Sequence, residues 1–156
     1  MPYSYPYPRA ALTVDCAVVA SHGGQPHVLL IQRDKPPSEG AWALPGGFLE
    51  LDETLADAAR RELREETSVT VERVQQLGTY DAIDRDPRER VLSVLHLAVL
   101  DGPPPAAKAA DDARSARWFP LSALPELAFD HAAMLESVQK HLAGVRGLLE
   151  RGGHHG

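Results

Sequence analysis

The chain has 156 residues, of which 44% are hydrophobic and 24% are charged, as in an ordinary globular protein. This length predicts one domain over residues 1–156 that buries roughly two-thirds of its unfolded surface. The formal net charge of −6 argues against nonspecific attraction to nucleic acid or to an anionic membrane, so we expect neither as a partner.

Cys16 is the only cysteine, so no internal disulfide can form. It lies in an apolar run, which is typical of a buried thiol, and the lack of disulfides suits a reducing compartment. No basic and apolar leader opens the chain, and the longest apolar run, residues 91–100, is too short to span a bilayer. We therefore expect a cytoplasmic protein.

The first half of the chain predicts strands followed by a helix. Residues 1–10 are rich in Tyr and Pro and predict an extended segment. Residues 12–20 and 27–33 are predicted strands, joined by a turn and followed by a Pro- and Gly-rich loop. The segment 44–47, Leu-Pro-Gly-Gly, predicts a sharp turn, because Pro fixes one φ and paired glycines allow positive φ.

The helix is expected to begin at Thr54, a predicted N-cap with Asp57 three residues later, and to reach Glu66. The elements expected after it are one or two strands in 69–82, a turn at 84–88, a buried strand at 91–100, a loop at 102–112, a strand at 116–120, a helix from about 130 to 150 and a frayed end at 151–156. Strands around a central helix, with a second helix at the end, predict an α/β (α+β) domain in which helices sandwich a mixed sheet.

Three carboxylates share one side of the predicted helix. Glu62, Glu65 and Glu66 stand at offsets of zero, three and four residues, which places them within one turn of each other. Like charges in this arrangement repel, and they need either free solvent or cations. Carboxylate oxygens are the ligands that Mg²⁺ or Mn²⁺ prefers. Taken alone, the cluster fits a metal site or a solvated helix face.

A longer spacing pattern distinguishes the two. Gly47 is followed after five residues by Glu53, and after seven more by Arg-Glu-Leu-Arg-Glu-Glu-Thr-Ser-Val at 61–69. This pattern resembles the Nudix box of the Nudix hydrolase superfamily, and eight of its nine defined positions match. Ser68 stands where the family usually has a glycine that ends the helix in a left-handed conformation.

The resemblance implies a Nudix fold and Mg²⁺-dependent hydrolysis, with Mn²⁺ as an alternative metal. It implies that Glu62, Glu65, Glu66 and the Gly46 carbonyl bind the metal. Arg61 would orient the carboxylates, and Glu53 would support them or position water. In the family, water attacks one phosphorus atom, and cations can lower the pKa of that water and neutralise charge on the phosphate oxygens.

Segments outside the box resemble ADP-ribose pyrophosphatases. These segments are 42–50, 77–81, 85–88, 116–121 and 127–131. They are also similar to Nudix domains fused to nicotinamide-mononucleotide adenylyltransferases and to those of NAD-metabolism repressors. The resemblance implies a small nucleotide substrate, with ADP-ribose cleaved to AMP and ribose 5-phosphate. Two alternatives stay open: hydrolysis of NADH or oxidised nucleoside triphosphates, and a non-catalytic ADP-ribose sensor.

Several residues outside the box are candidates with a competing structural explanation. Asp112, six residues before Trp118, would act as a base or extra metal ligand, or be a solvated loop acid beside Asp111. The candidates for substrate binding are Arg33, Trp42, Arg85 and Arg88. Arginines can bind phosphate through two hydrogen bonds, although arginines in turns are often solvated. Trp42 would stack on adenine or pack in the core.

Two further expectations concern the ends of the chain. Asp130 is predicted to be the N-cap of the last helix, and His131 to pack in its first turn. The Tyr- and Pro-rich residues 3–8 offer aromatic surface without an obvious local partner. N-terminal segments often help to build dimers in related ADP-ribose hydrolases, so the resemblance implies a homodimer.

Overall fold

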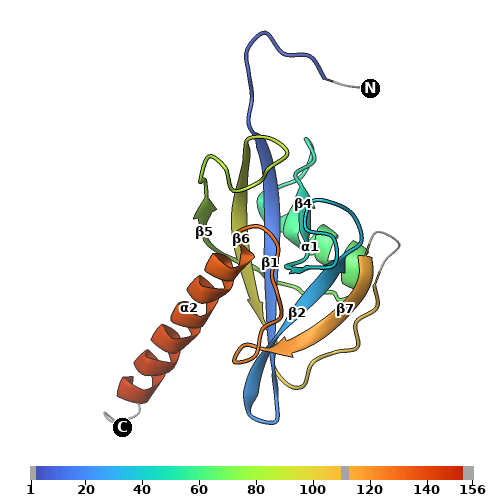
Figure 1. The fold of residues 1–156 in the computed structure, drawn as a ribbon. Coiled ribbons are helices and arrows are strands. Elements are labelled where there is room, and N and C mark those ends of the chain that lie inside the picture. The colour runs from blue at the N-terminus through green and yellow to red at the C-terminus, as the bar shows by residue number, and fades with distance from the viewer. Residues whose placement is uncertain (1–2, 110–112, 153–156) are drawn as a thin grey trace.

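The computed structural model describes residues 3–109 and 113–152, which form a seven-stranded sheet and two helices. In chain order the elements are β1 (Ala11–His22), β2 (Gln25–Arg33), β3 (Trp42–Ala43), β4 (Gly46–Phe48), α1 (Leu55–Thr67), β5 (Gln75–Tyr80), β6 (Val91–Val99), β7 (Ala113–Pro120) and α2 (His131–Gly152) (Figure 1). Within the described residues, neither helix is long and apolar enough to cross a membrane.

The sheet is mixed, as predicted. Its main path runs β3-β2-β1-β6-β5, while β4 pairs with β1 and β7 pairs with β2. β1 and β6 are parallel, from Ala11 opposite Val91 to Val19 opposite Val99, and the other strand pairs are antiparallel. β1 pairs with β4 near its start and with β2 near its end, so Gly46 lies opposite Asp15. This divided pairing brings the Gly-Gly segment against the middle of the sheet.

Helices cover both faces of the sheet, which confirms the predicted sandwich. Alternate residues of a strand point to opposite faces. Cys16 and Val18 of β1 therefore pack with Leu63 of α1, whereas Ala17 and Val19 pack in the cluster that contains Met134 and Leu135 of α2. These side chains are almost fully buried, and apolar burial at roughly 25 cal/mol per Å² holds the layers together. The far end of α2 extends beyond the sheet (Figure 1).

Both ends of α1 are set by local chemistry. The Thr54 side chain accepts a hydrogen bond of 3.1 Å from the Asp57 backbone N–H, which confirms the predicted N-cap. At the other end, Ser68 adopts a left-handed conformation with φ 64° and ψ 8°, and its N–H donates to the Arg64 carbonyl. Serine therefore takes the backbone conformation that a glycine adopts more readily.

The reason predicted for Gly46 and Gly47 is wrong, because neither glycine has a positive φ. Both lie in the extended strand β4, where space is the constraint. A Cβ on Gly46 would lie 2.2 Å from the Val14 carbonyl oxygen, and a Cβ on Gly47 would lie 2.6 Å from the Glu62 carboxylate. Glycine is needed here because the backbone approaches β1 and α1 closely.

The strand predicted to start at residue 69 begins only at Gln75. Val69 and Val71 are buried beside α1 without joining the sheet, and the Val69 N–H donates to Thr67 Oγ1 instead. The alternation of apolar and polar residues in the sequence resembles that of a strand, but among the described residues no neighbouring strand pairs with residues 69–74. The last helix begins at His131, directly after the predicted N-cap residue Asp130.

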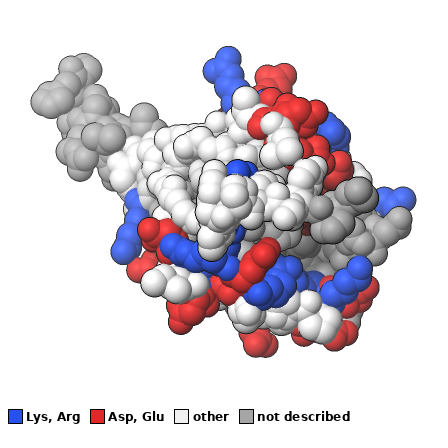
Figure 2. Space-filling view, turned by 90° about the horizontal axis from the view of Figure 1, so that it is seen from above, with Lys and Arg blue, Asp and Glu red and all other residues white. Residues whose placement is uncertain are grey.

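Residues 3–10 form no helix or strand and are exposed, with Tyr3 73% and Tyr7 60% accessible. The Arg9 guanidinium lies 3.7 Å from the Tyr5 ring centroid, so the segment is partly ordered by its own contacts. Figure 2 shows acidic and basic side chains interspersed around a largely uncharged centre on one face. A polyanionic ligand would therefore need local cations rather than a broad field.

Candidate functional site

Arg61, in the middle of α1, joins acidic side chains of this helix to Glu53, which precedes it. Its Nε and Nη2 donate to the two oxygens of Glu53 at 2.8 and 2.6 Å, a two-point ion pair. Its Nη1 donates to Glu62 Oε1 at 2.7 Å and to Glu65 at 3.2 Å. These hydrogen bonds lower the pKa of Glu53 to about 2. Arg61 therefore fixes Glu53 and Glu62 in place, while Glu65 stays 56% exposed.

Glu66 lies deeper than its neighbours and faces β4. The Gly46 N–H donates to Glu66 Oε1 at 3.4 Å, and the buried Oε2 has no hydrogen-bond partner among the described residues. Burial, followed by the nearby Glu62, raises the pKa of Glu66 to about 9. A buried oxygen without a partner is costly for a fold. A cation bound at this point would give Glu66 Oε2 the partner that it lacks among the described residues.

These residues fit a divalent cation. Glu62, Glu66 and the Gly46 backbone offer hard oxygen donors, and a cation there would offset both the burial and the mutual repulsion of the carboxylates. In the part of the chain that the structure describes, no group of three acidic, His or Cys side chains is already gathered in a metal-ligand arrangement.

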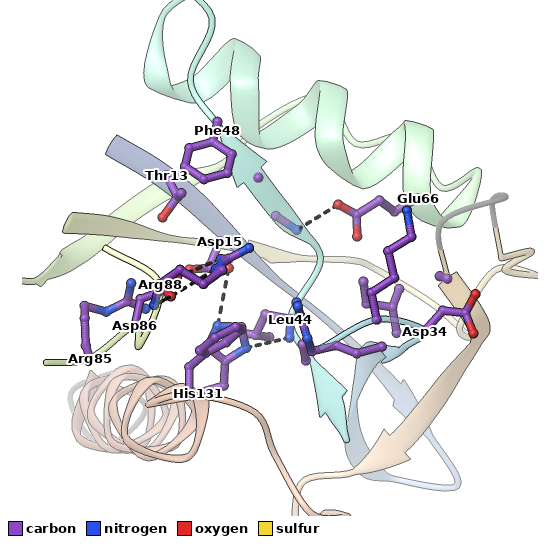
Figure 3. A pocket seen from close by; sticks show the side chains of 18 residues that line it. Thr13, Asp15, Asp34, Leu44, Phe48, Glu66, Arg85, Asp86, Arg88 and His131 are labelled. Carbon is purple, nitrogen blue, oxygen red and sulfur yellow. Dashed lines mark hydrogen bonds and ion pairs between the residues drawn. The ribbon is translucent and has the colours of Figure 1, made fainter. Parts of the chain in front are cut away.

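A cavity of about 300 Å³ adjoins Glu66 (Figure 3). The carboxylate cluster reaches it through Glu66 and the Gly46–Gly47 backbone. Its other walls come from β1, from β2 and the segment after it, from the loop between β5 and β6, and from the start of α2. The polar and aromatic side chains in these walls include Asp15, Arg33, Arg85, Asp86, Arg88, Phe129 and His131. The cavity thus has acidic groups near α1 and three arginines in its other walls.

The arginines of the cavity differ in their partners. Arg85 is almost fully buried and donates two hydrogen bonds, of 2.9 and 2.7 Å, to the Asp130 carboxylate. Asp130 stands directly before α2, at the position predicted for its N-cap, and its carboxylate pairs with Arg85. Arg88 is 45% exposed and pairs with Asp86 in its own loop. Arg88 is thus the more accessible of the two to a ligand.

The other predicted candidates lie in different places. Arg33 lines the cavity, and its Nε donates to the Pro37 carbonyl at 2.8 Å. Trp42 is not among the lining residues, and its ring packs edge-on against Phe119 with centroids 4.7 Å apart. Asp112, predicted as a base or metal ligand, lies outside the described residues, as does its neighbour Asp111.

Sequence reasoning missed Asp15 as a site residue. Asp15 is buried in the cavity wall, accepts a short hydrogen bond from the Ser93 hydroxyl, and lies 3.5 Å from His131 Nε2. His131 also accepts the Leu44 N–H on Nδ1, and burial lowers its pKa. The available signal was the single carboxylate within the apolar run of β1, since buried charge is rare without a partner.

The chain is similar in sequence to known proteins. Residues 10–138 match the NUDIX domain family. The chain is 43% identical over 114 residues to an ADP-ribose pyrophosphatase of Methanocaldococcus jannaschii. The match covers 72% of this chain and 66% of that protein. It is 36% identical over 134 residues to the ADPR responsive transcriptional repressor NtrR of Acinetobacter baylyi, covering 83% and 53%. The matches thus span just under two thirds of the first relative and about half of the second.

Solved structures show the same fold. The NUDIX domain of Shewanella oneidensis NrtR, complexed with ADP ribose, matches with a TM-score of 0.82 and 32% identity, over 89% of this chain and 94% of that one. A bifunctional NMN adenylyltransferase/ADP ribose pyrophosphatase from Francisella tularensis, complexed with AMP and a Mn ion, matches with a TM-score of 0.76 and 33% identity. That match covers 88% of this chain and 43% of the bifunctional protein.

Proposed function

Because this chain belongs to the Nudix family, we propose that its carboxylate cluster and the adjoining cavity form one active site. The site would hydrolyse the pyrophosphate bond of a nucleoside diphosphate derivative with the help of a divalent cation. The position of Glu66 carries this proposal. It lines the cavity, has a buried oxygen without a described partner, and contacts both Glu62 and the Gly46 backbone.

Each side chain of the cluster has a separate task in this proposal. Glu62 and Glu66 would hold the cation, with Glu65 and the Gly46 carbonyl beside them. We propose Mg²⁺ as the ion, with Mn²⁺ as a substitute. A bound ion supplies positive charge for the phosphate oxygens and acidifies water.

Glu53 and Arg61 would support that arrangement. Both Glu53 oxygens accept hydrogen bonds from Arg61, and Oε1 also accepts the Glu50 N–H. A carboxylate with a pKa of about 2 is a weak base near neutral pH. Glu53 is therefore better suited to holding Arg61 in place than to taking a proton from water.

We propose ADP-ribose as the substrate, with AMP and ribose 5-phosphate as the products. The similarity to an ADP-ribose pyrophosphatase supports this choice, as does the ADP ribose bound to a structural relative. Arg33 and Arg88 would bind the diphosphate, while binding energy from the two ends of the substrate would hold the pyrophosphate at the carboxylates. We expect kcat/KM for ADP-ribose to exceed that for NADH or oxidised dGTP by at least roughly tenfold, about 1.4 kcal/mol.

A binding function without catalysis is the second candidate, because the chain is also similar to an ADPR responsive repressor. Turnover of ADP-ribose, NADH and oxidised dGTP should be measured with Mg²⁺, with Mn²⁺ and with EDTA, and the products separated by chromatography. Faster hydrolysis of a triphosphate would overturn the substrate but leave the family. Tight ADP-ribose binding without turnover in either metal would identify a sensor.

A further inference from the structure

Phe129 contacts two of the cavity arginines. The Arg33 guanidinium carbon lies 4.8 Å from the Phe129 ring centroid, and that of Arg88 lies 5.6 Å from it. All three side chains line the cavity next to the carboxylate cluster. Arg33 comes from β2, Arg88 from the loop between β5 and β6, and Phe129 from the segment before α2. Three separate parts of the chain therefore meet at one ring.

Bringing these two cations together has a cost. Burial lowers the pKa of Arg33, and the nearby charge of Arg88 lowers it further, while Asp86 and Glu66 offset part of this effect. Arg88 has the Asp86 carboxylate as a partner, whereas the Nε–H of Arg33 donates to the neutral Pro37 carbonyl. The negative face of an aromatic ring offsets part of such repulsion, and an anion bound between the arginines would remove more of it.

The backbone of Phe129 is strained. Its φ is +52°, a left-handed conformation that residues other than glycine, asparagine and aspartate seldom adopt. The neighbouring residues hold it there. The Ala128 N–H donates to the Trp42 carbonyl, the Asp130 side chain pairs with Arg85, and the His131 N–H donates to the Ala128 carbonyl. Strain that the surroundings maintain is typical of a functional position.

We propose that Phe129 is a positioning residue that holds Arg33 and Arg88 as a two-cation clamp for a diphosphate group. The strained backbone fixes the ring, and the ring fixes the two guanidinium groups at separate points of the cavity wall. Each guanidinium would then bind one phosphoryl group. This inference rests on the proposed function for the choice of a diphosphate ligand, but it concerns binding and can be tested without turnover.

The test measures binding of methylenediphosphonate, a diphosphate analogue without a base or a sugar, by calorimetry in EDTA. Phe129→Leu keeps apolar volume but removes the aromatic face. We expect it to weaken binding roughly three- to tenfold, the equivalent of two moderate cation–π contacts. Pentafluorophenylalanine at position 129 keeps the shape of the ring but reverses its polarity, and it should weaken binding to a similar extent. Phe129→Tyr should bind within about twofold of the unchanged chain.

Phe119→Leu is the matched control, because it removes a Phe–Arg contact outside the cavity. The Arg117 guanidinium lies 5.3 Å from the Phe119 ring, and neither residue lines the cavity. This variant should bind methylenediphosphonate as the unchanged chain does. Thermal unfolding of every variant shows whether the fold is retained, and the fluorinated ring keeps the test valid if Phe129→Leu does not fold.

A double-mutant cycle tests the contact itself. If the ring positions Arg33, then Phe129→Leu should have less effect in an Arg33→Gln background than alone. Unchanged binding with the fluorinated ring would overturn the proposal, as would no measurable binding by the unchanged chain. If the ring instead stacks on the base, Phe129→Leu should weaken adenosine binding and leave methylenediphosphonate binding unaltered. That result would also overturn the proposal. Absence of ADP-ribose turnover would contradict the proposed function but not the clamp.

Discussion

The backbone N–H of Leu44 donates a hydrogen bond of 2.9 Å to Nδ1 of His131, which lies 87 positions further along the chain. Because Nδ1 accepts, the proton of the neutral ring is on Nε2, which faces Asp15 Oδ1 at 3.5 Å. The first residue of α2 therefore anchors the segment that leads into Gly46. Burial lowers the pKa of His131 below its ordinary value of 6.5, which favours the neutral ring in the folded chain.

This pairing predicts a pH dependence of stability. Below about pH 6.5 the unfolded chain protonates His131 more readily than the folded chain does, so the contribution of His131 to the free energy of unfolding should fall as the pH falls. Replacing His131 by Gln should reduce that slope by up to one proton, roughly 1.4 kcal/mol per pH unit. Urea unfolding between pH 7.5 and 5.5 measures both slopes. The lowered pKa of His96 acts in the same direction and the raised pKa of Glu66 in the opposite one, but both residues are present in both chains and cancel in the comparison. Equal slopes would contradict the prediction.

Gly47→Ala should damage activity more than stability. Its new Cβ would lie 2.6 Å from the Glu62 carboxylate, the flexible end of a side chain that can move away. Because Glu62 would be displaced from the cluster, we expect kcat to fall on the order of 10²-fold, with a small change in Tm. Gly78→Ala is the matched control, since a Cβ there meets nothing within 4 Å. Equal activity of the two variants would exclude a close-approach role for Gly47.

Glu66→Gln should lower turnover by orders of magnitude and weaken Mn²⁺ binding, measured by electron paramagnetic resonance. The fold should survive, because burial already disfavours the charge of Glu66 and Gln has the same shape. Glu65→Gln is expected to have a smaller effect, since Glu65 is 56% exposed and contacts Arg61 at 3.2 Å. Near-normal turnover by the Glu66 variant would remove this residue from the metal site.

Local signals in the sequence predicted the parts of the fold that depend on local chemistry. Thr54 and Asp57 stand at capping distance, and the apolar positions of α1 recur at helical spacing, so helix and cap were correctly predicted. β1, β2 and β6 were predicted because β-branched and apolar residues fill runs bounded by turn residues. Their order in the sheet depends on pairing between distant segments, which no short pattern records.

The missed features depend on contacts between distant residues. Asp15 became a cavity residue because Ser93 and His131 reach it from the parallel strand and from α2. Arg85 was predicted to bind substrate or to be a solvated turn residue, but Asp130, 45 positions away, binds it. Gly46 and Gly47 were recognised as special residues for the wrong reason, because crowding by β1 and α1 exists only in the folded chain.

Ser68→Gly should stabilise the protein. Ser68 has a φ of 64° at the C-cap of α1, a conformation that is less favourable for residues with a side chain than for glycine. We expect the free energy of unfolding to rise by about 0.5–1 kcal/mol in urea titrations. Ser68→Ala keeps a Cβ and lacks this relief, so it serves as the control. A gain no larger with Gly than with Ala would show that the left-handed conformation carries no strain.

Asp130→Asn should destabilise the fold, because it leaves the buried Arg85 without its counter-charge. The Arg85 side chain is 4% exposed and donates two hydrogen bonds to the Asp130 carboxylate, which is itself 22% exposed. Breaking such a pair from one side costs about 3 kcal/mol, so urea unfolding should show a loss of that order. Asp84→Asn changes an exposed acid beside Arg85 and should alter stability by less than about 0.5 kcal/mol. If Asp130→Asn were equally harmless, Arg85 would be free to bind substrate, and its assignment as a structural residue would fail.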